Sequence, residues 1–300
     1  MDKLKMLNRI KELYDNGENV IQYLKSLDSS EKNNLEDILI SYDIQAGIYT
    51  SRADINRNVR NVYCENLANV LSELEPFDSL LEIGVGEAST LGNLLPKLKN
   101  TPKSIFGFDI SWSRIKYANE FLKSLNLKNL ESIRLSTGDL FNSPFADNSI
   151  DVVYTSHSIE PNGGKETEAL KALYRISKKY IVLLEPDYGL ANDEAKARMK
   201  KNGYVTNLYE TAIKLGYNVL KHELFVPTFN PLNPTSLIVI KKHENEEFIS
   251  SEFACPITHS LLEKKKSAYY AKDALLAYPI LDGVPCLLPE NAIIASHFLD

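Results

Sequence analysis

Apolar residues recur along the chain at two different spacings. Over the first 75 residues they return every three to four positions, as at Leu4, Leu7 and Ile10, which is the period of one face of an α-helix. From residue 79 onward, short apolar runs alternate with helical stretches. The pattern predicts a helical N-terminal segment followed by an α/β unit.

The apolar runs of the α/β unit predict seven strands. Five runs that alternate with helices indicate a parallel sheet covered on both faces, with strands at 80–83, 104–108, 133–136, 150–155 and 180–184. Helices are expected at 113–125, 166–176, 191–200 and 205–215. The last two runs, 218–225 and 236–241, flank a Pro-rich loop and predict an antiparallel pair at the sheet edge.

A charged stretch after the last strand predicts a linker. Residues 241–247 carry no apolar face, as is typical of a connecting segment. The strand-like runs beyond it form a unit that is short for independent stability, so we expect it to pack on the main domain. The expected organisation is a helical cap over 1–75, a main domain over 76–241, a linker over 242–252 and a small α+β unit over 253–300.

Composition narrows the class of protein. The 300 residues are 44% hydrophobic and 25% charged, and no apolar run is long enough to cross a bilayer. Because the first residues lead into an amphipathic pattern, we expect no signal peptide. Three widely spaced cysteines argue against a disulfide framework and fit a reducing compartment, so we expect a cytoplasmic protein. The net charge of −6 disfavours a nucleic-acid partner. No membrane partner is expected, and a homodimer is left open.

The first strand of the main domain runs into a turn with two glycines. Gly84 and Gly86 let a backbone approach a ligand closely, and the helix that follows points free N–H groups toward the turn. Glu82 lies at the carboxyl end of this strand, where open α/β sheets bind ligands. Asp109 ends the second strand and Asp139 follows the third. These carboxylates either bind the hydroxyls of a nucleoside or only cap the following helices.

These strand ends resemble the motifs of the class I S-adenosylmethionine-dependent methyltransferases. The matching residues are Glu82, Gly84, Gly86, Asp109, Ile110, Asp139 and Leu140. The resemblance covers about residues 45–241 and implies a Rossmann-like methyltransferase sheet, mostly parallel with an antiparallel last strand, and S-adenosyl-L-methionine as cofactor. It implies that the glycine turn contacts the methionine end of the cofactor. Asp109 would then bind the ribose, and Asp139 with Leu140 would border the adenine.

Residues near the fourth strand carry the expected chemistry. Methyl transfer depends mainly on positioning, but an oxygen nucleophile also needs a base. His157 is the candidate, because an imidazole with a pKa of about 6.5 accepts a proton at neutral pH; alternatively it only lines the pocket. Glu160, the second catalytic candidate, opens a loop that either holds substrate or simply turns. Ser156 is expected at the cofactor. Tyr49, in a loop expected over 42–49, either covers the sulfonium or is ordinary core.

The C-terminal unit resembles the Trm112-like (UPF0434) domains, which are related to zinc ribbons and can serve as partners or activators of methyltransferases. The match lies at Cys255-Pro256 and over residues 276–288. Metal-binding members carry cysteine pairs, whereas this chain has Cys255 with His259, and Ala271 and Ala274 at the second pair. A structural zinc needs four ligands, so we expect no metal here.

The expected function is S-adenosylmethionine-dependent O-methylation of a small polar substrate, such as a sugar or nucleotide-sugar. The acidic balance and the lack of patches that combine Lys or Arg with aromatic residues favour a small molecule over RNA. The C-terminal unit keeps open the alternative of a tRNA or protein acceptor. A cofactor-binding scaffold without catalysis is the third reading.

Overall fold

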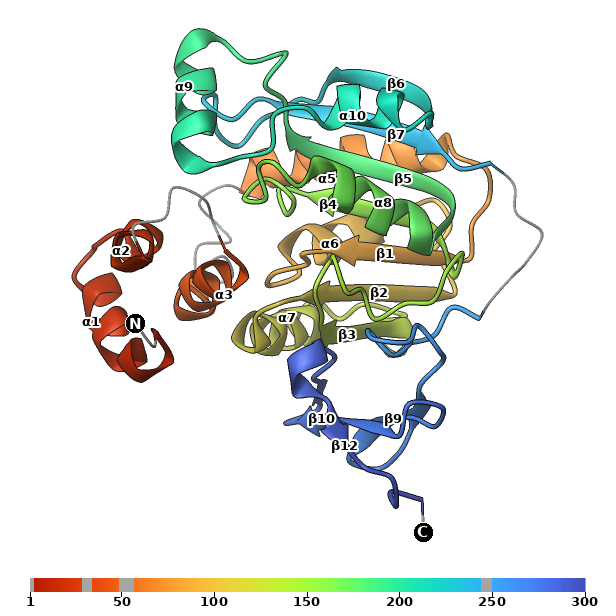
Figure 1. Cartoon of the computed structure of the whole chain (residues 1–300). Helices are drawn as coiled ribbons and strands as arrows, with labels where there is room; N and C mark the ends of the chain where they lie inside the picture. Colours follow the sequence, from red (N-terminus) through yellow and green to blue (C-terminus); the bar gives the residue numbers. More distant parts are fainter. Residues whose placement is uncertain (1–2, 29–33, 49–56, 244–249, 300) are drawn as a thin grey trace.

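A seven-stranded sheet forms the centre of the computed structural model, which describes residues 3–28, 34–48, 57–243 and 250–299. The strand order is β3-β2-β1-β4-β5-β7-β6 (Figure 1). The strands are β1 (Ser79–Ile83), β2 (Ser104–Asp109), β3 (Ile133–Thr137), β4 (Ile150–Ser156), β5 (Ser177–Pro186), β6 (Asn218–Leu224) and β7 (Thr235–Lys241). Strands β1 to β5 are parallel, and β7 runs antiparallel to both β5 and β6. The predicted α/β sheet with an antiparallel finish is confirmed.

Helices cover both faces of this sheet. One face packs on α5 (Arg57–Ser72), α6 (Ser89–Leu94) and α7 (Trp112–Ser124), and the other on α8 (Glu166–Ile176) and α10 (Leu208–Lys214). Short 3₁₀ segments are η2 (Leu95–Lys97) and η3 (Leu130–Ser132), and α9 (Asp193–Asn202) lies between β5 and α10. The helix expected over 205–215 is shorter than predicted. None of the described helices is long and apolar enough to cross a membrane.

The N-terminal helices form a separate small cluster. They are η1 (Lys3–Met6), α1 (Leu7–Asp15), α2 (Val20–Asp28) and α3 (Leu35–Ile44), and α3 contacts α7 (Figure 1). The buried Lys3 ammonium binds the carboxylates of Asp28 and Asp37, so it joins three segments of the cluster. The loop expected from residue 42 is wrong at its start, because α3 continues to Ile44.

The C-terminal unit is a small sheet that packs on the main domain. Its elements are β8 (Glu263–Lys264), β9 (Ala268–Ala271), β10 (Leu276–Leu281), β11 (Val284–Pro285), η4 (Pro289–Asn291) and β12 (Ile293–Ile294). Cys286 makes a parallel bridge to Thr137 at the β3 edge, and the backbone of Phe253 pairs with Phe145. The unit therefore continues the hydrogen bonding of the main domain across the sheet edge.

Lys242 differs from the solvated linker that its charged neighbours predict. Its side chain is buried, and Nζ donates to Asn148 Oδ1 at 2.6 Å and to the Ser177 carbonyl at 2.9 Å. Burial lowers the pKa of Lys242 to about 8. At the other end of the predicted linker, Glu252 pairs with Arg134. Both described ends of this segment are thus attached to the main domain.

Candidate active site

The turn after β1 has a backbone that favours glycine. Gly84 and Gly86 have φ angles of +65° and +54°, in the region that L-residues rarely adopt. A Cβ on Gly84 would lie 2.2 Å from the Cβ of Ser158. The glycine turn therefore packs directly against the segment that follows β4.

The carboxylates of Glu82, Asp109 and Asp139 lie around this turn, and each is buried among different residues. Asp109 accepts hydrogen bonds from the Gly86 and Ser111 amides at 3.1 and 2.9 Å, and burial raises its pKa against the opposing charge of Arg114. Glu82 accepts one from the Tyr154 hydroxyl at 2.7 Å, and burial raises its pKa to about 8.

Asp139 follows β3 on the same side of the sheet. Its carboxylate accepts a hydrogen bond from the Asn142 side chain at 2.9 Å, and burial raises its pKa. The segment after Asp139 is a turn, not a helix, so the alternative that Asp139 only caps a helix does not hold. The N-cap of α7 is Ser111, not Asp109.

Two adjoining cavities open at these strand ends. One, of about 160 Å³, is lined by residues that include Asp109, Ile110, Asp139 and Leu140. The other, of about 480 Å³, is lined by residues that include Glu82, Gly86, Ser156, Asn230 and Asn233. Both share Gly84, Arg114, His157 and Glu160. The structure thus brings together every predicted site residue except Tyr49, which lies outside the described residues.

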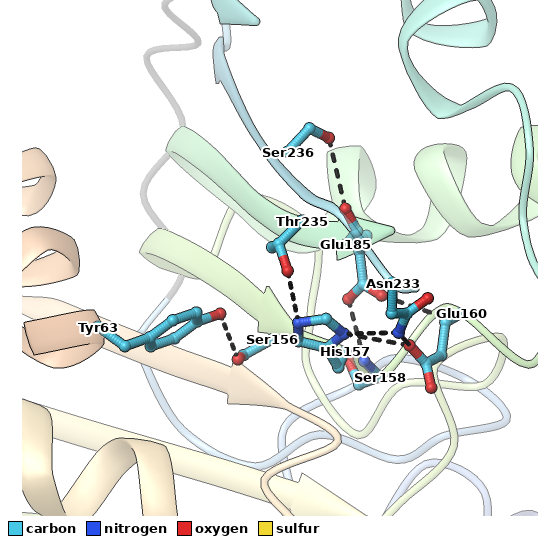
Figure 2. A network of polar contacts seen from close by, with 9 residues as sticks. All are labelled: Tyr63, Ser156, His157, Ser158, Glu160, Glu185, Asn233, Thr235 and Ser236. Atoms are coloured by element: carbon cyan, nitrogen blue, oxygen red, sulfur yellow. Dashed lines mark hydrogen bonds and ion pairs between the residues drawn. The ribbon is translucent and has the colours of Figure 1, made fainter. Parts of the chain in front are cut away.

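His157 and Glu160 form a hydrogen-bonded pair between the cavities (Figure 2). The Nδ1 atom of His157 lies 3.1 Å from Glu160 Oε2, and Nε2 lies 2.9 Å from the Thr235 hydroxyl. Asn233 Nδ2 donates to the same Glu160 oxygen at 3.0 Å. Burial opposes the charged imidazole, but Glu160 and then Glu185 raise the pKa of His157 above its ordinary value. The imidazole is held at both nitrogens.

Sequence patterns did not single out Asn233, Thr235 or Phe229 for this site. All three follow β6 or begin β7, and Phe229 lines the larger cavity while its ring packs 4.9 Å from Tyr63. A polar residue in the Pro-rich loop between two terminal strands is the only signal that marks Asn233. Its placement beside Glu160 depends on the antiparallel pairing of β7 with β5.

The N-terminal cluster covers the smaller cavity through α3. Leu35, Ile38 and Tyr42 contribute to the cavity wall. The Asp43 carboxylate accepts hydrogen bonds from the Ser111 hydroxyl at 2.6 Å and from the Ser113 amide and hydroxyl at 3.1 and 3.0 Å. A carboxylate from another element thus caps α7, which fixes α3 over the strand ends.

Comparison with known proteins finds similarity over part of the main domain. Residues 81–183 match the family model described as "Methyltransferase domain". A solved geranyl diphosphate C-methyltransferase from Streptomyces coelicolor, in complex with Mg²⁺, geranyl diphosphate and S-adenosyl-L-homocysteine, is 11% identical with a TM-score of 0.50, over 62% of this chain and 80% of that chain. A geranyl diphosphate methyltransferase structure in complex with SAM has the same identity and TM-score, over 66% and 91%. This similarity shows the fold, a Rossmann-like methyltransferase sheet.

A further match involves a short segment. A UPF0434 protein of Caulobacter vibrioides is 50% identical over 40 residues, which are 13% of this chain. The chain spans 62% of the length of that relative.

Proposed function

We propose that the chain is an enzyme that transfers a methyl group from S-adenosyl-L-methionine to an oxygen atom of a small polar acceptor, such as a sugar or nucleotide-sugar. The match over residues 81–183 supports the methyltransferase and its cofactor, and both solved structures named above contain SAM or its demethylated product. Geranyl diphosphate, the substrate of those two enzymes, is not the acceptor that we propose for this chain.

The residues at the ends of β1, β2 and β3 fit this cofactor. Gly84 and Gly86 both line the larger cavity and have the positive φ angles of a tight turn, so their backbone can approach a ligand closely. Asp109 would accept hydrogen bonds from the ribose, Asp139 with Leu140 would border the adenine, and Glu82, Ile110 and Ser156 complete the predicted contacts. When bound, the cofactor supplies an electrophilic methyl group on a sulfonium centre.

The larger cavity carries the proposal for the acceptor. It adjoins the glycine turn and presents Asn230 and Asn233 together with the ring of Phe229. A few hydrogen-bonding side chains next to an aromatic face suit a small hydroxylated ring. At about 480 Å³, the cavity is also in the size range of small-molecule sites.

His157 and Glu160 would take up the proton that the acceptor hydroxyl loses. A neutral imidazole is the competent base, so the rate should rise as the pH passes the raised pKa of His157. Hydrogen bonds at both ring nitrogens fix the orientation of the imidazole. Direct proton transfer at Nε2 requires the Thr235 hydroxyl to turn away, and His157 with Glu160 would otherwise orient the acceptor.

Calorimetry with S-adenosylmethionine and S-adenosylhomocysteine tests the cofactor site. Replacing Asp109 by alanine should weaken binding by about 1.5–3 kcal/mol, because a hydrogen bond to a charged group is lost. Asp78→Ala is the control, since this exposed aspartate pairs with Lys103 at the opposite end of the sheet. If the wild-type chain binds neither ligand, the proposed function is wrong.

A panel of sugars, nucleotide-sugars and tRNA then tests the acceptor through formation of S-adenosylhomocysteine. Methylation of tRNA alone would contradict the small acceptor. Cofactor binding without turnover on any acceptor would favour the scaffold reading.

We also propose that residues 253–300 are a UPF0434-like unit, which the 40-residue match supports, and that this unit holds no metal. Stoichiometric zinc in the purified protein would contradict this.

A further inference from the structure

A buried carboxylate lies behind the turn that carries His157 and Glu160. Glu185, near the end of β5, is fully buried and accepts hydrogen bonds from the backbone amides of Ser158 at 3.0 Å and Glu160 at 3.1 Å (Figure 2). It is not among the residues that line either cavity. Glu185 therefore does not contact a ligand in these cavities, and its hydrogen bonds reach them through the 157–160 turn.

The 157–160 turn needs such support, because its first residue has a backbone that L-residues disfavour. His157 has a φ angle of +56°, which costs a non-glycine residue about 1–2 kcal/mol. Its amide donates to the Leu184 carbonyl at 2.9 Å, next to Glu185 on the same strand. Two successive β5 residues therefore hold three amides of the turn.

We propose that Glu185 is the positioning residue for the His157–Glu160 pair: its two carboxylate oxygens fix the 157–160 turn so that both side chains face the acceptor cavity. This inference rests on the proposed function, since it assigns the pair a role in methyl transfer. A carboxylate can serve two amides at once, whereas a carboxamide offers one oxygen and turns an NH₂ group toward the second amide. Glu185→Gln should release one end of the turn.

The charges around Glu185 make this arrangement measurable. Burial raises the pKa of Glu185 to about 7, while the neighbouring His157 lowers it and Glu160 raises it. Burial and then the Glu185 charge raise the pKa of Tyr63, which belongs to α5. The amides of Ser158 and Glu160 should consequently show NMR shifts that follow the pH with a midpoint near 7.

The chain contains a matched control at the other end of the sheet. The buried Asp151 carboxylate, near the start of β4, accepts hydrogen bonds from the backbone amides of Asp78 and Ser79 at 2.8 and 3.1 Å. Both amides bind Asp151 Oδ2, whereas the two amides of the 157–160 turn bind separate oxygens of Glu185. Asp151→Asn therefore removes the charge of a buried carboxylate that holds two amides, away from the cavities, while its remaining oxygen can keep both hydrogen bonds. A stability loss common to both variants reports burial, not positioning.

The test compares the full-length wild-type chain, Glu185→Gln and Asp151→Asn by NMR. In Glu185→Gln, the Ser158 and Glu160 amides should lose the part of their pH-dependent shift that comes from Glu185 and should follow the titration of His157 alone. The imidazole of His157, assigned among the five histidines by its loss in His157→Gln, should titrate at lower pH. Both signals should be unchanged in Asp151→Asn.

Two results would overturn the proposal. The first is an unchanged His157 titration in Glu185→Gln, with a stability loss equal to that of Asp151→Asn. The second, which needs only the wild-type chain and so holds even if a variant fails to fold, is hydrogen exchange of the Ser158 and Glu160 amides as fast as that of exposed amides, because amides held by Glu185 should be protected. Failure of the wild-type chain to bind S-adenosylhomocysteine would instead refute the proposed function, and the NMR result would stand separately.

Discussion

Replacing Phe253 by alanine should destabilise the whole chain and not the C-terminal unit alone. The Phe253 side chain is 2% exposed, and its ring lies 5.7 Å from Phe106, 5.6 Å from Phe145 and 5.4 Å from Tyr269. Phe106 belongs to β2 and Tyr269 to β9. A single ring therefore contacts the main sheet on one side and the small sheet on the other.

The expected loss follows from this burial. Truncating a buried phenylalanine to alanine costs about 3–5 kcal/mol, including the cavity that remains. The backbone hydrogen bond from Ala254 to the Pro144 carbonyl, at 2.9 Å, stays in place, so the loss belongs to the side chain. Phe298→Ala is the control, because this ring stacks on Tyr270 within the small unit at 5.0 Å. That loss should be about 1 kcal/mol, typical of a partly buried site.

Urea unfolding followed by two probes measures the effect. Trp112 is the one tryptophan of the chain, and its indole N–H donates to the Leu281 carbonyl at 3.3 Å. Its fluorescence therefore reports docking of the C-terminal unit, while circular dichroism reports the whole chain. In Phe253→Ala both transitions should move together to lower urea. A fluorescence transition that separates from an unchanged dichroism transition would refute a shared core.

Three further changes test the cap, the glycine turn and a buried acid. Asp43→Ala should weaken the attachment of α3 to α7 by about 1–2 kcal/mol. The amides of α3 should then exchange hydrogen faster than in the wild type, while those of β1 are unchanged; α3 exchange equal to that of the wild type would contradict the capping role. Gly84→Ala should weaken S-adenosylhomocysteine binding at least about fivefold, because the new Cβ would lie 2.2 Å from the Cβ of Ser158 and overpacking costs about 1–3 kcal/mol. Gly164→Ala, also at positive φ but with open space, should leave binding unchanged; equal effects would point to backbone strain alone. Glu82→Gln should gain stability over the wild type as the pH rises. Folding raises the pKa of Glu82 from 4.5 to about 8, so its stability contribution is present below pH 4.5 and is lost as the pH approaches 8; a constant difference from pH 5 to 8 in denaturation midpoints would argue against a protonated Glu82.

Local patterns predicted that three acidic side chains lie at one edge of the sheet. Glu82, Asp109 and Asp139 lie at or just after the ends of predicted strands, and parallel strands bring their carboxyl ends to one edge. Their positions therefore depended only on recognising each strand, and the glycine turn marked the first of them. The helix starts were less certain: α10 begins at Leu208, three residues later than the apolar pattern predicts.

The surroundings of His157 depend on strand pairings that no local sequence pattern specifies. Thr235 reaches His157 because β7 pairs antiparallel with β5, in a register that sets Pro186 opposite Thr235. The charged residues around Lys242 predict a linker, but its side chain is buried. Two of its partners are the backbone carbonyls of Tyr174 and Ser177. A sequence carries no signal that tells which backbone carbonyls a lysine side chain will reach.

Carboxylates at strand ends serve two purposes in this molecule, and the sequence does not separate them. Asp109 and Glu185 both end or nearly end a parallel strand, and each accepts hydrogen bonds from two backbone amides. Asp109 is 8% exposed and lines a cavity, so its remaining lone pairs can reach a ligand. Glu185 is 0% exposed and lines neither cavity, and its two carboxylate oxygens accept from the turn. We therefore expect that access to the cavity, and not position at a strand end, distinguishes an acid that binds a ligand from one that orients the residues around it.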